Sequence, residues 1–440
     1  MNVNGRSWLA RMTPTRLLTV FAATLAVAGC SASPAAPPAQ SVRGQKLEVA
    51  AVWSGVEQRH FELVLSAFTR QTGASVTYTS AGYGIPAFLA ARLARGHPPD
   101  VAFLPQPGLL RQYAAEHLIV PLDAVAVSAV ASNYSLVWRQ LGSAGGRLYG
   151  VWFKAADKSL VWYNEGVFER EGVAPPADVD GLVRLAHRLA RSGVPAFSVG
   201  GQDGWTLADW FSNLYLRLAG PVRYDRLAAH QIRWTDPSVI AALRLLARVL
   251  DPHVIAGGPR AAVLTSYPES VQQAFAIPPA AAMVFEGDFV AGIIRAVTPA
   301  VTGVDAGVFP FPALGPPSPA VVAGGDAAVL MRRSAAGDAL ISYLASPRAA
   351  AIWAAAGGFV SPNVNVGLAV YPDAISRFIA ASLLQAGDSF RFSLSDLTPP
   401  GFGGTEGQGM RKSLQQFLVS RDVSGTAAQL EQEARKAYPA

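Results

Sequence analysis

LEVAAVW, residues 47–53, is the stretch on which the interpretation of the fold depends. It is a short, continuous apolar run of the length that a buried strand has. The next segment, 57–72, carries apolar residues at helical spacing and stops at Gly73, a residue type that commonly ends a helix. We therefore predict a strand followed by a helix, whose buried face consists of Phe61, Val64, Leu65 and Phe68.

The same order of elements continues downstream. Residues 75–79 alternate as a strand does, residues 86–95 have a helical pattern, and DVAFL at 100–104 is another strand of the buried type. Alternating strands and helices predict an α/β fold in which helices cover a parallel-rich sheet. Ligands bind such sheets beyond the carboxyl ends of the strands, so the loops after these three strands are the first candidates for a site.

A second set of helices predicts a second core. Residues 178–192 and 237–250 each place apolar side chains along one helical face. Glycine and proline interrupt extended segments near 303–312 and 357–362. We interpret both interruptions as crossovers between two lobes.

The composition is that of a large folded protein. The chain has 440 residues, of which 51% are hydrophobic and 15% charged, which is too apolar for a disordered chain and long enough for more than one domain. Its single cysteine, Cys30, excludes an internal disulfide framework and cysteine-ligated metal centres. Lysines and arginines are scattered through the sequence, so we predict no nucleic-acid binding.

The N-terminus has the pattern of an export signal. Three arginines precede an apolar run at 17–29, which is shorter than the roughly 20 residues that span a bilayer. VAGC at 27–30 resembles a bacterial lipobox, in which the cysteine receives a diacylglyceryl group. We predict a lipoprotein signal peptide at 1–29, lipidation of Cys30, and a flexible spacer at 30–45 that anchors the folded part to the membrane.

Common catalytic signatures are absent from the sequence, including G-x-S-x-G, H-E-x-x-H and the Walker A motif. The six histidines include no pair with metal-ligand spacing on a helix face, and we predict neither a metal nor a cofactor. Glycoside hydrolysis needs only two carboxylates at the right separation in space, so a secreted glycoside hydrolase stays open as an alternative. Its candidate acids are Asp157, Asp203, Glu286 and Asp288.

Aromatic and polar side chains gather in three predicted loops. A sugar presents apolar C–H faces and a ring of hydroxyls, and its sites combine aromatic rings with carboxylates and amides. This composition therefore points to carbohydrate as the ligand. The three groups are Trp152, Phe153, Lys154 and Asp157; Gln202, Asp203, Trp205, Asp209 and Trp210; and Phe285, Glu286, Asp288 and Phe289.

The order of motifs resembles that of a family-1 extracellular solute-binding protein, the sugar-binding lipoprotein of a bacterial ABC importer, and within that family the binding proteins for α-glucosides. The matching tracts cover most of the chain and are specific in combination. They are VW at 52–53, FTRQTGASVTY at 68–78, PPDVAFLPQPGLL at 98–110, LIVPLD at 118–123, LYGVWFKAADKSLVWYNEGVF at 148–168, GWTLADWFSNLYLRLAG at 204–220, AAMVFEGDF at 281–289 and GGFVSPN at 357–363.

The resemblance implies a two-lobed α/β fold of the type II periplasmic-binding-protein kind, with the ligand cleft between the lobes. By analogy, the N-terminal lobe comprises 46–151 and 309–360. The C-terminal lobe comprises 160–307 and 365–440.

The resemblance also implies where the ligand binds. One departure from the family pattern is Pro105-Gln106-Pro107, which replaces a charged pair of the maltose binder, so maltose is not assigned as the ligand. Tyr83 is a candidate replacement for an aromatic contact. The predicted ligand-binding residues are Glu57, Gln58, Tyr83, Gln106, Trp152, Asp157, Gln202, Asp203, Trp205, Glu286 and Phe289.

The expected function is capture without chemistry. A di- or oligosaccharide, with an α-glucoside as one candidate, binds between the lobes of a monomer, favours the closed state and is delivered to the permease subunits of an ABC importer. The expected location is the extracytoplasmic face of the cell membrane. The alternatives are a binder of another small polar solute, such as a polyamine, a peptide or a glycerophosphodiester, and the hydrolase named above.

Overall fold

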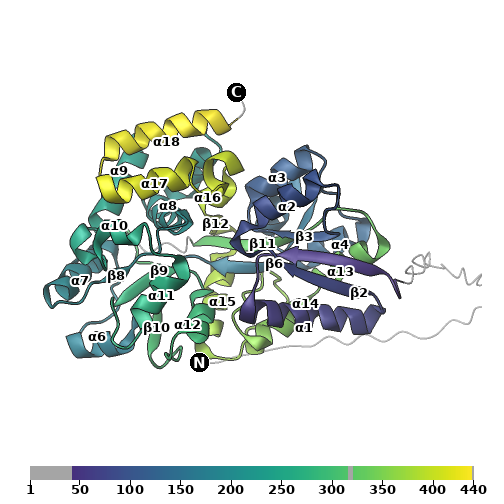
Figure 1. Cartoon of the computed structure of the whole chain (residues 1–440), viewed down its shortest axis with the longest axis horizontal. Helices are drawn as coiled ribbons and strands as arrows, with labels where there is room; N and C mark the ends of the chain where they lie inside the picture. The colour runs from purple at the N-terminus through teal and green to yellow at the C-terminus, as the bar shows by residue number, and fades with distance from the viewer. Residues whose placement is uncertain (1–41, 316–320, 439–440) are drawn as a thin grey trace, which may run out of the picture. The chain divides into compact units, whose positions relative to one another are not determined.

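The computed structural model describes residues 42–315 and 321–438. The predicted signal peptide at 1–29, Cys30 and most of the spacer at 30–45 lie outside the described residues. The described chain contains two larger sheets, each with its own helices, and Figure 1 shows the two groups side by side.

The first sheet has the strand order β12-β11-β3-β1-β2, and β6 pairs with the other side of β11. β1 is parallel to both β2 and β3, as the alternation of strands and helices predicts. β11 runs antiparallel to β3 and β6, which makes the sheet mixed. The strands are β1 (Lys46–Ala51), β2 (Ser75–Ser80), β3 (Val101–Leu104), β6 (Gly150–Asp157), β11 (Val322–Leu330) and β12 (Arg391–Phe392).

Helices of the first group cover this sheet, and Figure 1 shows α1 and α14 on one side of it and α2 and α3 on the other. The predicted buried face of α1 is confirmed, and Gly73 ends this helix with a φ of 75°. The helices are α1 (Gly55–Thr72), α2 (Ile85–Ala94), α3 (Pro107–Ala115), α4 (Ala124–Asn133), α5 (Leu136–Leu141), α13 (Ala335–Leu344), α14 (Pro347–Ala356) and α15 (Ala374–Ala386), with short turns η1 (Gly82–Gly84), η3 (Leu368–Val370) and η4 (Gly387–Ser389) and a small hairpin of β4 (Ser143–Ala144) and β5 (Arg147–Leu148).

The second sheet has the order β10-β7-β9-β8, and only β8 and β9 are parallel. Asp178 caps α7 by accepting from the backbone of Gly181, and the predicted apolar face of that helix is buried. The elements are β7 (Leu160–Asn164), β8 (Phe197–Ser198), β9 (Met283–Glu286), β10 (Ala306–Pro310), α6 (Glu165–Glu171), α7 (Val179–Arg191), α8 (Trp205–Ala228), α9 (Pro237–Val249), η2 (Pro252–Val254), α10 (Gly258–Ala262), α11 (Tyr267–Phe275), α12 (Val290–Val297), α16 (Leu394–Leu397), η5 (Pro400–Gly404), α17 (Gly409–Ser420) and α18 (Val423–Ala437).

Two clusters of buried apolar side chains form the cores. In the first, Trp53 packs against Phe61, Phe103 and Trp353, with ring centroids 4.7–4.8 Å apart. In the second, Trp210 packs against Phe285 with a centroid distance of 4.3 Å. The residues around each sheet thus form one lobe, and we call them the first and second lobes.

The chain passes between the sheets at three places: between β6 and β7, between β10 and β11, and after β12. The predicted crossover near 303–312 overlaps the second of these. The one predicted near 357–362 is wrong, because Phe359 and Val360 belong to the first core and Val360 bridges to Ala155 of β6. In addition, α15 packs against β6 and β12 pairs with β11, so the first lobe includes part of the segment 365–440 that was predicted for the second.

Candidate ligand-binding pocket

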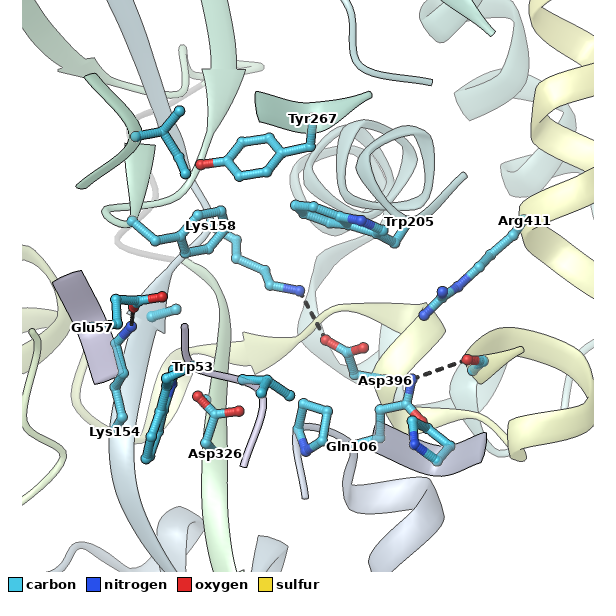
Figure 2. Close-up of a pocket in the computed structure, with 18 residues that line it drawn as sticks. Trp53, Glu57, Gln106, Lys154, Lys158, Trp205, Tyr267, Asp326, Asp396 and Arg411 are labelled. Atoms are coloured by element: carbon cyan, nitrogen blue, oxygen red, sulfur yellow. Dashed lines mark hydrogen bonds and ion pairs between the residues drawn. The ribbon is translucent and has the colours of Figure 1, made fainter. Parts of the chain in front are cut away.

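A pocket with a volume of about 180 Å³ lies where the two lobes meet, and Figure 2 shows the side chains around it. The first lobe contributes residues at the ends of its strands and the starts of its helices. The second lobe contributes mainly helix N-terminal residues and a C-terminal segment. The lining residues are Val52, Trp53, Glu57, Pro86, Pro105, Gln106, Lys154, Ala156, Gly325 and Asp326 from the first lobe, Lys158 from the connection between β6 and β7, and Trp205, Tyr267, Phe289, Ile293, Asp396, Gly404 and Arg411.

Aromatic rings form a large part of the walls. Trp205 and Tyr267 are the first residues of α8 and α11, and Phe289 directly precedes α12. Their ring centroids lie 5.2–6.0 Å apart, so the three rings form one apolar surface. Trp53 lines the pocket from the first lobe, where the rings of the first core hold it.

One ion pair lies on the first-lobe side. Lys154 of β6 donates to Glu57 of α1, and its ammonium also lies 5.4 Å from the ring centre of Trp353. Burial alone would lower the pKa of Lys154, but the negative charges of Glu57 and its neighbours outweigh burial and raise that pKa. Lys154 therefore stays charged at neutral pH.

A second lysine is held by two carboxylates. The Lys158 ammonium lies 2.9 Å from Asp396 and 3.2 Å from Asp209, and 5.5 Å from the ring centre of Trp205. Figure 2 shows it reaching between Trp205 and Asp396. Its stem crosses Gly324 of β11, where a Cβ would come 2.6 Å from the Lys158 Cε. Burial opposes the charge, yet the two aspartates raise the pKa of Lys158.

Several acids at or behind the pocket hold their protons more strongly than usual. Burial raises the pKa of Asp326, which lines the pocket, to about 6. Burial likewise raises the pKa of Asp209 to about 6, although Lys158 opposes this shift. Burial and the nearby Asp209 raise the pKa of Glu286 well above its ordinary value, and neither of its carboxyl oxygens has a hydrogen-bond partner in the described chain.

Arg411 completes the polar lining from α17. Its Nε donates to the Gly403 carbonyl at 2.9 Å, and Figure 2 shows its side chain directed into the pocket. No ion pair of Arg411 is found among residues 42–315 and 321–438. Its terminal nitrogens can therefore donate to a ligand.

Four of the predicted ligand-binding residues line this pocket: Glu57, Gln106, Trp205 and Phe289. The structure thus brings together residues that are far apart in sequence. Tyr83 belongs to η1, but its side chain lies outside the described part of the structure.

Three predicted residues are buried behind the pocket and do not line it. Trp152 packs between Trp138 and Phe392, with its ring centre 4.8 Å from that of Phe392. Asp157 is fully buried and accepts from the backbone of Ser159, because strand alternation turns it away from Lys154 and Ala156. Glu286, the last residue of β9, is also enclosed. We correct the expectation that these side chains form the surface of the cleft.

The other three predicted ligand-binding residues lie outside the pocket and are not buried behind it. Gln58 donates to Glu62 along the exposed side of α1. Gln202 is exposed in the turn before α8, where its carbonyl accepts from Gln415, and the neighbouring Asp203 does not line the pocket. Of this turn and the start of α8, Trp205 is the residue that lines the pocket.

Sequence reasoning missed most of the charged lining. Lys154 was named in one of the aromatic and polar groups but not as a ligand contact, and Lys158, in the same matched tract at 148–168, was not singled out. Asp326 follows two glycines in a strand, a pattern that indicates a close backbone approach. Asp396, Gly404 and Arg411 lie in the C-terminal region, where no motif marked them.

None of the four acids proposed for a hydrolase lines the pocket, since Asp157, Asp203, Glu286 and Asp288 are absent from its walls. Within the described residues, no group of three histidine, cysteine, aspartate or glutamate side chains is arranged to hold a metal ion. Within that part of the chain, no helix is both long enough and apolar enough to cross a membrane.

The fold and the position of the pocket define a class, the two-lobed solute-binding proteins. The model of the bacterial extracellular solute-binding protein family matches residues 55–351, so the chain belongs to this family. This confirms the family predicted from the motifs. It is a family of binding proteins, and the chain is not an enzyme.

Two relatives match most of the chain. The osmoprotective compounds-binding protein GgtB of Synechocystis sp. is 31% identical over 380 residues, which cover 83% of this chain and 88% of the relative. The alpha-glucosides-binding periplasmic protein AglE of Rhizobium meliloti is 30% identical over 382 residues, which cover 82% and 81%.

Solved structures show the same fold at lower sequence identity. The bacterial solute receptor AcbH superposes with a TM-score of 0.78 at 20% identity, over 90% of this chain and all of AcbH. A chitin oligosaccharide binding protein gives a TM-score of 0.74 at 17% identity, over 89% of this chain and 98% of that one. The predicted fold class is thereby confirmed.

Proposed function

We propose that this protein captures a small, electrically neutral sugar or glycoside outside the cytoplasm and delivers it to the permease of an ABC importer. The observation that carries the proposal is the lining of the pocket, which combines four aromatic rings with a balanced set of charges. Three acids, Glu57, Asp326 and Asp396, face three bases, Lys154, Lys158 and Arg411.

A balanced set of charges favours a neutral ligand with many hydroxyls. Hydroxyl groups both donate and accept, so a sugar can bond to carboxylates and to cations at once. Polyamine binding would instead call for an excess of acids, which this lining does not have. The relative AglE, an alpha-glucosides-binding protein, supports the same substrate class.

The size of the pocket supports a short ligand. Its volume of about 180 Å³ is below the roughly 300–1,000 Å³ of pockets that take drug-sized molecules. Hydrogen bonds to charged groups contribute about 1.5–3 kcal/mol each. A few of these, with stacking on the rings, suffice for micromolar affinity, about −8 kcal/mol, after the cost of association.

Capture requires the ligand to favour one arrangement of the lobes. Because both lobes line the pocket, a ligand that touches both stabilises the closed form relative to an open one. The closed form is then the state that docks on the permease.

Calorimetric titration tests the proposal. The panel consists of glucose, maltose, isomaltose, trehalose and sucrose, with spermidine and a dipeptide as the rival classes. We expect at least one sugar to bind at micromolar concentration and spermidine and the dipeptide not to bind. Binding of spermidine alone, or release of product from p-nitrophenyl α-glucoside, would contradict the proposal.

We also propose that lipid on Cys30 anchors the mature protein to the outer face of the membrane. The support is the sequence VAGC at 27–30 after a short apolar run. Cys30→Ala should move the expressed protein from the detergent phase to the aqueous phase in detergent partitioning. Unchanged partitioning of this variant would refute the anchor.

A further inference from the structure

One end of the pocket is closed by a contact between the lobes. Gln106 stands directly before α3, and its Nε2 donates to the carbonyl of Gly404 at 3.3 Å. Gly404 ends η5, and a Cβ there would lie 2.6 Å from the Gln106 Oε1, so a larger residue would displace the Gln106 amide from this position. Both residues line the pocket, and their contact places them at the same end of it.

Backbone contacts continue the closure beside Gln106. A side chain at Gly108 would overlap the carbonyl of Thr398, so the N-terminus of α3 packs directly on the segment before η5. Arg111 of α3 donates to the carbonyl of Leu397. We call this contact between Gln106, Gly108 and Arg111 on one side and residues 397–404 on the other the end wall.

A larger cavity lies on the far side of the end wall. It has a volume of about 850 Å³ and is lined by Gly108, Arg111 and Leu397, and by residues 399–401. Asp396 and Gly404, which flank that segment, line the ligand pocket instead. The end wall is therefore a thin partition between two cavities.

The opposite end of the pocket is less enclosed. Glu57 keeps 34% of its side chain exposed, and Pro86 and Ile293 are half-buried, whereas Gln106 is 4% exposed. The pocket is therefore more open beside Glu57 than beside Gln106.

Gln106 also has a polar atom that a ligand could contact at this end of the pocket. Its Oε1 is buried and has no hydrogen-bond partner in the described chain. A buried acceptor without a partner is costly, and a ligand hydroxyl would satisfy it. Prolines on both sides of Gln106 restrict its backbone, so the side chain is presented in a defined direction.

We infer that the end wall fixes the length and orientation of the ligand: the terminal hydroxyl of a sugar ring donates to Gln106 Oε1, and no further unit fits beyond it. This inference rests on the proposed function, since it describes how the same pocket selects among sugars. According to this inference, Gln106 determines specificity for a sugar chain whose terminal hydroxyl is unblocked.

Two singly blocked disaccharides test the inference. Maltose is blocked at its reducing end as the p-nitrophenyl α-glycoside, or at its non-reducing end as the 4,6-O-ethylidene derivative, and isomaltose is derivatised in the same way. For the sugar that binds, calorimetry should show one blocked form within threefold of the parent and the other at least 30-fold weaker. Similar affinities for both blocked forms would overturn the inference.

In Gln106→Ala, the affinities of the two blocked forms should differ by less than about fivefold. Binding of the parent sugar should weaken about fivefold, as loss of one hydrogen bond predicts. Gln58→Ala is the matched control, because Gln58 is a glutamine of the same lobe that lies outside the pocket. If the ratio of the affinities of the two blocked forms is unchanged in Gln106→Ala, the inference is also overturned.

The end wall can also be judged by cross-linking, both without ligand and in the presence of any sugar that binds, because the ligand favours the closed form in which the lobes touch. In a Cys30→Ser background, Gln106→Cys with Gly404→Cys should be joined by a short bismaleimide, whereas Gln58→Cys with Gly404→Cys should not. If no sugar binds but the first pair is joined, the proposed function fails and the end wall stands. If sugars bind but the pair is not joined, the end wall fails and the function stands.

Discussion

Lys154 and Lys158 are four residues apart on one segment, yet their acidic partners differ in exposure to solvent. Lys154 pairs with Glu57, which keeps 34% of its side chain exposed. Lys158 pairs with Asp209 and Asp396, whose side chains are 0% and 9% exposed. Glu57 can therefore leave Lys154 for a ligand or for water at little cost, whereas the acids around Lys158 are more deeply buried and hold that lysine more firmly, although Lys158 and Asp396 also line the pocket. The first pair is suited to recognition, and the second arrangement holds the pocket together.

The largest expected effect follows from that difference. Lys158→Met leaves two buried carboxylates without their cation, and such a loss costs about 3–5 kcal/mol of unfolding free energy. Urea denaturation at pH 7 measures it. Lys154→Met is the matched control and should lose clearly less, because Glu57 reaches solvent. Equal losses in the two variants would contradict the comparison.

A smaller effect is expected for the aromatic wall. Trp205→Ala should weaken sugar binding at least tenfold, which is about 1.4 kcal/mol, by removing a ring that faces the ligand. Its stability should change little, since Trp205 is only half-buried. Titration calorimetry together with thermal denaturation separates the two effects. Unchanged affinity would show that the indole does not contact the ligand.

The smallest effect on binding is expected for Asp157, which the sequence placed in the cleft and the structure buries behind it. Asp157→Asn should change sugar affinity less than threefold in calorimetry. A loss of tenfold or more would restore Asp157 as a contact residue and contradict its placement behind the pocket.

The same variant should show a pH effect on stability. Burial raises the pKa of Asp157 to about 6, above its ordinary 3.8, so the folded protein binds the proton more tightly than the unfolded chain does. The stability that this group contributes is fully present below about pH 4 and is lost as the pH rises to about 6. Asp157→Asn should therefore gain stability relative to the wild type over that range, measured by urea denaturation at several pH values. A constant difference would refute the raised pKa.

The local pattern of the sequence sufficed for many elements. Helical spacing and a terminal glycine predicted α1, and the apolar run DVAFL predicted β3. The order of motifs predicted the family and the two-lobed fold. These features depend on residues near one another in the chain, or on tracts that keep their order, and both are visible without coordinates.

The pocket was predictable only in part, because side-chain direction depends on register and packing. Trp205 and Phe289 were found through aromatic density, but the same criterion selected Trp152, which packs into the core. An acid at the end of a buried strand is equally plausible on either face, and Asp157 lies on the face away from the pocket.

By itself, the sequence determined the alternation of strands and helices and the membership of the family, since each is recorded in local composition or in the order of motifs. Only the tertiary structure decided which residues meet around the ligand pocket. Gln106 and Gly404 are 298 positions apart, and Lys158 and Asp396 are 238 apart, so no local pattern connects them. They meet because the chain returns to the lobe boundary after β12 and brings residues 396–404 against Gln106 and Lys158.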